Sequence, residues 1–255
     1  MRIVKAIIIA FSMYSKIPMP QFQWKDEDMK YMLCFFPWIG AVIGGCVYFW
    51  GIICEKYVIS LLCYTLIGTA IPLLITGGFH VDGFMDTMDA FGSYQPTEKK
   101  LEILKDSHIG AFAVIMLGVY GLLYMAAFSE IGDKNLLQIV CAGFFLSRCL
   151  SGISVVSFPL AKKEGLLYSF ANKAGKNIVK VSLYLQGTLC MLFMLWCSLF
   201  AGMIVVIAAL SAFVYYYYRS KKELGGITGD TAGYFLILCE CSMVVAVAVI
   251  NIVWM

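Results

Sequence analysis

Charged residues are scarce in this chain. They make up 14% of its 255 residues, while hydrophobic residues make up 61%. A typical soluble protein is about 25% charged. No polar stretch approaches the roughly 50 residues that an independent soluble domain needs. The composition therefore excludes a separate soluble domain and predicts a single integral membrane domain over residues 1–255.

The sequence also lacks a Cys-x-x-Cys motif, a large net charge and a signal-peptide cleavage site. The ten cysteines contain no Cys-x-x-Cys pair and fall within or beside apolar runs, so we expect reduced, inert core residues. A net charge of +3 is too small to indicate a nucleic-acid partner. The N-terminus begins like a signal peptide, but Tyr14 to Pro18 follow where a small-residue cleavage site would stand. We expect a short helix at the membrane surface there.

Long apolar runs dominate the rest of the sequence. A helix crosses a bilayer with about 20 residues, and suitable runs occupy 32–54, 58–75, 109–128, 136–156, 181–200, 203–218 and 232–254. They predict an all-α polytopic membrane bundle of about seven transmembrane helices. Only Ala201 and Gly202 separate the fifth and sixth runs, so residues 181–218 form either a tight hairpin or one bent helix, which would leave six spans.

Basic residues predict the orientation. Cytoplasmic loops of membrane proteins are rich in Lys and Arg, and 16 of the 19 basic residues lie before the first run or between runs two and three, four and five, or six and seven. The opposite side has only Lys56 and Lys134, and Arg148 lies inside the fourth run. We expect the N-terminus to face the cytoplasm and the C-terminus to lie outside.

Acidic residues concentrate just after the second run. Asp82, Asp86 and Asp89 have the spacing i, i+4, i+7, which places them on one face of a helix. Like charges at this spacing repel, and a bound dication would relieve the repulsion. Oxygen-only ligands favour Mg²⁺, with Mn²⁺ as the alternative. Asp106 is a further candidate as a metal ligand or base, and equally as the N-cap of the third span.

Other polar residues suggest phosphate contacts. His80 could be a base, a phosphate contact or a structural histidine. Arg148 and Glu240 lie at similar depth in two spans, so they form either an ion pair or a phosphate site, and we favour phosphate because guanidinium binds it in a bidentate way. The loop from Gly225 to Gly233 opens the last span, where helical N–H groups can bind an anion. The alternative for this loop is a flexible connection with Asp230 as N-cap.

Several of these motifs resemble one known family. Residues 77–89 (GGFHVDGFMDTMD), 101–110 and 225–231 closely resemble cobalamin synthase, also called adenosylcobinamide-GDP ribazoletransferase, with weaker similarity at 16–20, 36–40, 147–148 and 164–166. The resemblance implies a polytopic inner-membrane enzyme that requires Mg²⁺. Such an enzyme joins adenosylcobinamide-GDP to α-ribazole or its 5′-phosphate and releases GMP. Partners would then be these small molecules and membrane lipid, and a homo-oligomer is compatible with them.

The combined hypothesis places the chemistry on the cytoplasmic face. Asp82, Asp86 and Asp89, together with Asp106, are the predicted metal ligands and catalytic carboxylates, one of which deprotonates the ribose hydroxyl. The predicted substrate and phosphate contacts are His80, Lys105, Arg148, Thr228, Gly229 and Asp230.

Two alternatives remain open at this point. An aspartate-rich helix is also typical of the CDP-alcohol phosphotransferases, which would here act on a lipid alcohol, but Asp86 and Thr87 stand where that group has Ala and Arg. A divalent-cation transporter would need charged sites in several spans, and this chain offers mainly Arg148 and Glu240.

Overall fold

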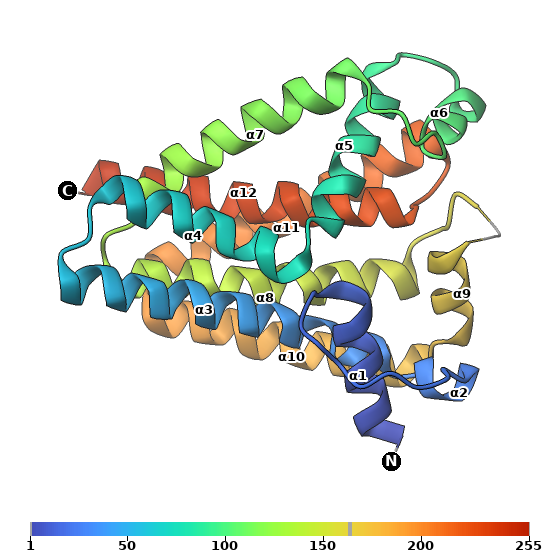
Figure 1. Cartoon of the computed structure of the whole chain (residues 1–255), viewed down its shortest axis with the longest axis horizontal. Helices are drawn as coiled ribbons and strands as arrows, with labels where there is room; N and C mark the ends of the chain where they lie inside the picture. The colour runs from blue at the N-terminus through green and yellow to red at the C-terminus, as the bar shows by residue number, and fades with distance from the viewer. Residues whose placement is uncertain (1, 163–164, 255) are drawn as a thin grey trace.

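The computed structural model describes residues 2–162 and 165–254, and helices dominate both ranges (Figure 1). Within these ranges no strand is formed, and the only β-type pairing is an isolated parallel bridge between Leu160 and Ile227. The prediction of an all-α bundle is confirmed.

Eight long helices and several short ones make up the fold. The long helices are α3 (Phe36–Tyr57), α4 (Leu61–Thr76), α5 (Phe79–Gly92), α7 (Ala111–Ser129), α8 (Lys134–Ser157), α10 (Lys176–Cys197), α11 (Leu199–Leu224) and α12 (Gly229–Trp254). The short helices are α1 (Arg2–Tyr14), α2 (Asp26–Met29), the 3₁₀ turn η1 (Met32–Cys34), α6 (Thr97–Ile103) and α9 (Leu166–Lys173).

Six of the described helices are long and apolar enough to cross a membrane: α3, α7, α8, α10, α11 and α12. The predicted second span corresponds to α4, which has only 16 residues and is followed by α5 after a bend of 93°. Gly77 and Gly78 make this bend with φ of 66° and 78°, a backbone region that glycine adopts without steric cost. The α4 and α5 pair adds a seventh crossing if it is counted as one broken span.

The region 181–218 forms a tight hairpin. Helix α10 ends at Cys197 and α11 begins at Leu199, with the Ser198 hydroxyl accepting the Ala201 N–H at 3.3 Å as an N-cap. A Cβ placed on Gly202 would lie 2.5 Å from the Met194 carbonyl oxygen, so the two helices touch closely at this point. The alternative of a single bent helix over residues 181–218 is wrong, and so is the count of six spans that would have followed from it.

Helix α8 lies at the centre of the bundle. The most apolar 18-residue window of α8 is 89% buried, compared with 22% for the equivalent windows of α7 and α10. A Cβ on Gly40 or Gly44 of α3 would lie within 2.3 Å of an α8 carbonyl oxygen, which is the small-residue packing typical of membrane helices. The short helices α1, α2, α6 and α9 and most of α5 lie toward one end of the bundle, and the C-terminus lies at the other (Figure 1).

The remaining predictions about the fold concern cysteine and the N-terminus. All ten cysteines are free, and six of them are buried as predicted for core residues, whereas Cys46 is exposed. The predicted N-terminal helix is present as α1, with Ala6, Ile9 and Ala10 buried and Ile3 and Val4 exposed. One apolar face of α1 therefore packs on the bundle and another is left uncovered.

Candidate active site

The site is organised by a close crossing of α5 and α12. A Cβ placed on Gly83 of α5 would lie 2.8 Å from the backbone oxygen of Asp230, and one on Gly233 of α12 would lie 2.9 Å from the backbone oxygen of His80. A glycine on each helix therefore lets the two backbones touch. The crossing brings the start of α12 against the acidic face of α5.

Three carboxylates meet at this crossing. Asp86 is half-buried, and the negative charges of Asp82, Asp230 and Asp89 all act on it. Asp82 is exposed and shares a cavity of about 300 Å³ with Asp230. We call it the acidic cavity. The sequence suggested Asp230 as a phosphate contact, whereas its position here places it in the acidic group with Asp82 and Asp86.

Asp89 has a different set of neighbours. Its Oδ2 accepts the Gly110 N–H at 2.7 Å and its Oδ1 accepts the Ala113 N–H at 2.9 Å, so Asp89 caps the first turn of α7 from a neighbouring helix. A Cβ on Gly110 would lie 2.5 Å from the Asp89 carboxylate, so the glycine permits the approach. The cap that the sequence offered to Asp106 is made by Asp89, and that alternative for Asp106 is wrong.

Asp106 lies apart from the other predicted carboxylates. It is exposed, does not line the acidic cavity, and its Oδ1 accepts the backbone N–H of His108 at 3.0 Å and lies 2.6 Å from Nδ1 of the same residue. This side-chain hydrogen bond lowers the pKa of Asp106 and raises the pKa of His108. Lys105 is exposed on the same loop. The structure therefore gives no geometric support to Asp106 as a fourth ligand.

The start of α12 is built by reciprocal capping. The Thr228 N–H donates to Thr231 Oγ1 at 2.8 Å, and the Thr231 N–H donates to Thr228 Oγ1 at 3.2 Å. Both hydroxyls are used in the cap, so Thr228 supports the helix start and Gly229 is the exposed backbone there. Backbone hydrogen bonds from the Ala161 N–H to the Ile227 oxygen and from the Ile227 N–H to the Pro159 oxygen, each 2.9 Å, tie this loop to the segment that follows α8.

A basic residue that the sequence analysis did not single out lies beside the acids. Lys162 lines the acidic cavity, and its positive charge acts on Asp230. Its Nζ also lies 3.4 Å from the Leu101 carbonyl oxygen. Tyr168 of α9, which no sequence motif singled out, lines the same cavity. Neither residue stands near the acids in sequence, so only the fold could reveal their position.

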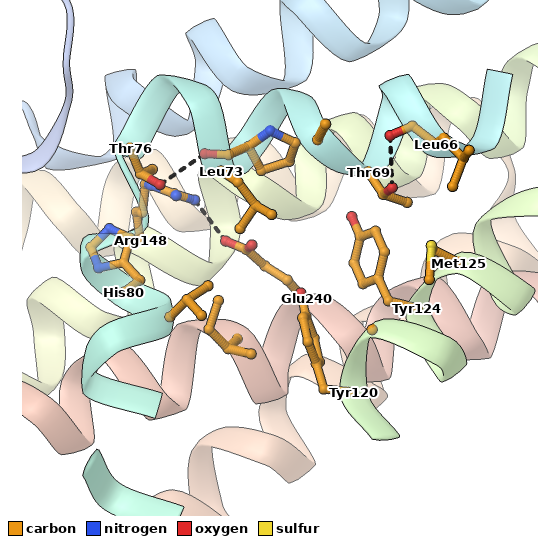
Figure 2. Close-up of a pocket in the computed structure, with 15 residues that line it drawn as sticks. Leu66, Thr69, Leu73, Thr76, His80, Tyr120, Tyr124, Met125, Arg148 and Glu240 are labelled. Atoms are coloured by element: carbon orange, nitrogen blue, oxygen red, sulfur yellow. Dashed lines mark hydrogen bonds and ion pairs between the residues drawn. The ribbon is translucent and has the colours of Figure 1, made fainter. Parts of the chain in front are cut away.

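Arg148 and Glu240 form the ion pair that the sequence offered as one of two readings. Arg148 Nη1 lies 2.7 Å from Glu240 Oε1 and 2.8 Å from the Phe144 carbonyl oxygen, and the Ser147 hydroxyl donates to the same Glu240 oxygen at 3.0 Å. Arg148 is 1% exposed. Neither Arg148 nor His80 lines the acidic cavity. Figure 2 shows both beside a different cavity, so the geometry favours the ion pair over the phosphate contact.

Comparison with known proteins gives the family. The family model described as cobalamin-5-phosphate synthase matches residues 6–248, which is nearly the whole chain. The chain belongs to this family. Three curated relatives, all named adenosylcobinamide-GDP ribazoletransferase, are similar over almost their full lengths. The protein from Lachnoclostridium phytofermentans is 43% identical over 98% of this chain and 95% of its own length.

The other two relatives are more distant. The Clostridium perfringens protein is 32% identical over 96% of this chain and 98% of its own length, and the Listeria monocytogenes protein is 31% identical over 90% and 92%. No solved structure matches the chain. Membership of the cobalamin-5-phosphate synthase family confirms the resemblance. It supports a cobalamin synthase function over that of a lipid-alcohol phosphotransferase or a cation transporter.

The carboxylates at the acidic cavity offer oxygen ligands, which a hard divalent cation such as Mg²⁺ prefers. Within the described residues no three His, Cys, Asp or Glu side chains are already close enough to form a ready metal group. Mg²⁺ commonly takes only one or two protein carboxylates and completes its shell with water and substrate phosphate oxygens. Asp82 and Asp230, which line one cavity from two helices, fit that mode of binding, and Asp86 lies near both of them.

Proposed function

We propose that the chain joins adenosylcobinamide-GDP to α-ribazole, or to its 5′-phosphate, and releases GMP. The product is adenosylcobalamin or its 5′-phosphate, the corrinoid with its lower ligand attached. Two curated relatives are named for this reaction, and the match to this chain covers 95% and 98% of their own lengths. The structural observation that supports it is that Asp82 and Asp230 line one cavity, while Asp86 lies close enough for the charges of both to act on it.

The reaction is a substitution at phosphorus. The ribose hydroxyl oxygen of α-ribazole forms a bond to the corrinoid-side phosphorus of the diphosphate, and the bond from that phosphorus to the oxygen of GMP breaks. The proton of the hydroxyl passes to a carboxylate of the acidic cavity. GMP takes the bonding electrons as its phosphate.

Residues of this chain can perform each of these tasks. Asp82, Asp86 and Asp230 would hold Mg²⁺, with Mn²⁺ as the alternative, and accept the proton; the ion, when bound, neutralises diphosphate charge. The exposed backbone at Gly229 lies at the positive end of the α12 dipole, which favours phosphate oxygens. Lys162 adds a positive charge in the same cavity.

The protein is a multi-pass membrane protein by its six apolar helices. Its bias of basic residues supports a position in the cell (inner) membrane with the N-terminus and the acidic cavity facing the cytoplasm. A cytoplasmic site would meet its nucleotide-linked substrate and free Mg²⁺ on the same side.

The direct test is GMP release by the purified chain in proteoliposomes that receive adenosylcobinamide-GDP and α-ribazole. GMP should appear only when both substrates are present, stop on addition of EDTA, and resume when excess Mg²⁺ is added. GMP release that continues in EDTA would contradict the Mg²⁺ assignment. Absence of GMP under all conditions would contradict the reaction itself.

A further inference from the structure

A second cavity adjoins the acidic cavity. Phe79, Leu167 and Gly229 line both of them, so the two spaces meet at these three residues. The second cavity continues inward between α1, α3, α5, α8, α9 and α12. We call it the aromatic slot, because Tyr14, Phe36, Phe79 and Phe170 are among the residues that line it.

Several aromatic rings form part of these walls. Tyr14, Phe36, Phe79 and Phe170 line the slot together with the imidazole of His80. The Tyr14 and Phe36 ring centroids are 4.5 Å apart, and the Tyr14 and His80 rings are stacked with 21° between their planes. Apolar and aromatic walls with few polar groups are typical of sites for flat, largely apolar ligands. The slot has a volume of about 70 Å³, so its walls must move apart to admit such a ligand.

One polar atom in this setting is without a partner. His80 is 4% exposed, and its Nε2 makes no hydrogen bond to any described residue. A buried polar atom without a partner is costly, and each such atom in a native structure calls for an explanation. An imidazole nitrogen can donate or accept a hydrogen bond, so a ligand nitrogen in the slot would satisfy it.

We propose that the aromatic slot binds the base of the riboside substrate, an inference that rests on the proposed function. The base of α-ribazole is a benzimidazole, with one ring nitrogen bonded to ribose and the other free to accept a hydrogen bond. His80 Nε2 donates to that free nitrogen, and the aromatic walls contact the faces of the base. The ribose then extends past Gly229 into the acidic cavity, where its hydroxyl meets the diphosphate.

The larger cavity in Figure 2 is a poorer place for the base. It has a volume of about 330 Å³ between α4, α7 and α12, with Arg148 and Glu240 in its wall (Figure 2). It shares His80 with the aromatic slot but no lining residue with the acidic cavity. A base bound there would hold the ribose hydroxyl away from the three carboxylates.

The test measures KM separately for the two substrates with the full chain in proteoliposomes. The ribosides compared are α-ribazole and an analogue in which a C–H group replaces the free ring nitrogen. Wild type should prefer α-ribazole by roughly tenfold, about the discrimination that one buried hydrogen bond provides. His80→Phe should abolish the preference and raise the KM for α-ribazole, and His80→Gln, which keeps a donor, should retain part of it. The KM for adenosylcobinamide-GDP should stay within about twofold.

A second variant tests the slot without changing His80. Val155 of α8 lines the slot and neither of the other two cavities, so Val155→Phe should fill it and raise only the riboside KM. Tyr124→Phe, which removes an unpartnered hydroxyl from the cavity of Figure 2, is the matched control and should change neither KM.

The two proposals fail in different ways. Normal GMP release with an unchanged riboside KM in both His80→Phe and Val155→Phe would overturn the slot alone, and so would an equal rise in both substrate KM values. If His80→Phe does not fold, Val155→Phe decides the question by itself. A wild-type protein that releases no GMP would overturn the proposed function together with the slot.

Discussion

At the scale of single residues, identical side chains on one helix face have different surroundings. Asp82, Asp86 and Asp89 are equivalent by spacing, and the sequence predicted a common role for them. In the structure Asp82 faces an open cavity, whereas Asp89 binds backbone N–H groups of residues 21 and 24 positions later in the chain. Helical periodicity shows which face a residue occupies but not which distant segment covers that face.

Asp89→Ala should therefore weaken folding more than chemistry. It removes the cap of α7, and lost caps cost about 0.5–2 kcal/mol. We expect a lower midpoint of thermal unfolding in detergent, with GMP release per folded molecule largely retained. Asp106→Ala is the control, because an exposed side chain should change stability by less than about 0.5 kcal/mol. Equal stability of the two variants would contradict the capping role.

The Arg148 and Glu240 pair shows the same limit of sequence reasoning. The sequence places both residues at similar depth in two spans. It does not show whether their side chains point toward each other, and this decides between an ion pair and a phosphate site. Glu240→Gln leaves a buried guanidinium without its counter-charge, and breaking a buried pair typically costs about 3–5 kcal/mol. Replacing both residues with apolar ones should cost clearly less than the sum of the single variants.

An exposed ion pair supplies the comparison for that experiment. Lys134 and Glu55 lie 2.9 Å apart with both side chains 60% exposed, and exposed pairs contribute at most about 1 kcal/mol. Glu55→Gln should therefore barely change unfolding in detergent. Equal losses for Glu55→Gln and Glu240→Gln would contradict the buried pair.

At the scale of elements, the decisive feature is the crossing of α5 and α12. The acidic helix and the loop before the last span were each predicted from the sequence. Their contact was not, because it depends on Gly83 and Gly233, which lie 150 residues apart. No local pattern shows that a glycine is needed for a neighbour so distant in the chain.

Gly83→Ala tests this crossing. The new methyl group would meet the Asp230 backbone, so α5 must shift away from α12 at a cost of about 1–3 kcal/mol. We expect GMP release to fall at least tenfold, because Asp230 is separated from Asp82 and Asp86. Gly45→Ala is the matched helical control, since a Cβ there meets nothing within 4 Å. Full activity of Gly83→Ala would show that the crossing is not required.

At the scale of the whole molecule, the spans were largely predictable. Twenty apolar residues are a strong signal in a chain with so few charges, and every predicted run overlaps a helix. The sequence did not predict that the second run is short and turns by 93° into α5. The bend depends on the two consecutive left-handed glycines, Gly77 and Gly78, and permits the acidic helix to leave the direction of α4.

The orientation proposed from the basic residues can be measured. If the N-terminus faces the cytoplasm as proposed, a fluorescent-protein fusion at this end should be bright. A C-terminal alkaline phosphatase fusion should be active if that end faces outward as proposed. Truncated fusions ending in the α6 region should give a cytoplasmic signal. The reverse pattern would place the acidic cavity on the outer face and contradict a cytoplasmic site.

The most direct test of the account is GMP release in proteoliposomes by Asp82→Asn, Asp86→Asn and Asp230→Asn, with Asp106→Asn as the matched control. Removing either carboxylate that lines the acidic cavity, or that of Asp86 beside them, should lower GMP release at least a hundredfold, with insertion and unfolding unchanged. Asp106→Asn should stay within about threefold of wild type, because its carboxylate contacts only its own loop. Near-normal release by Asp230→Asn, or a loss in Asp106→Asn as large as in Asp82→Asn, would contradict the assignment of the acidic cavity as the reaction centre.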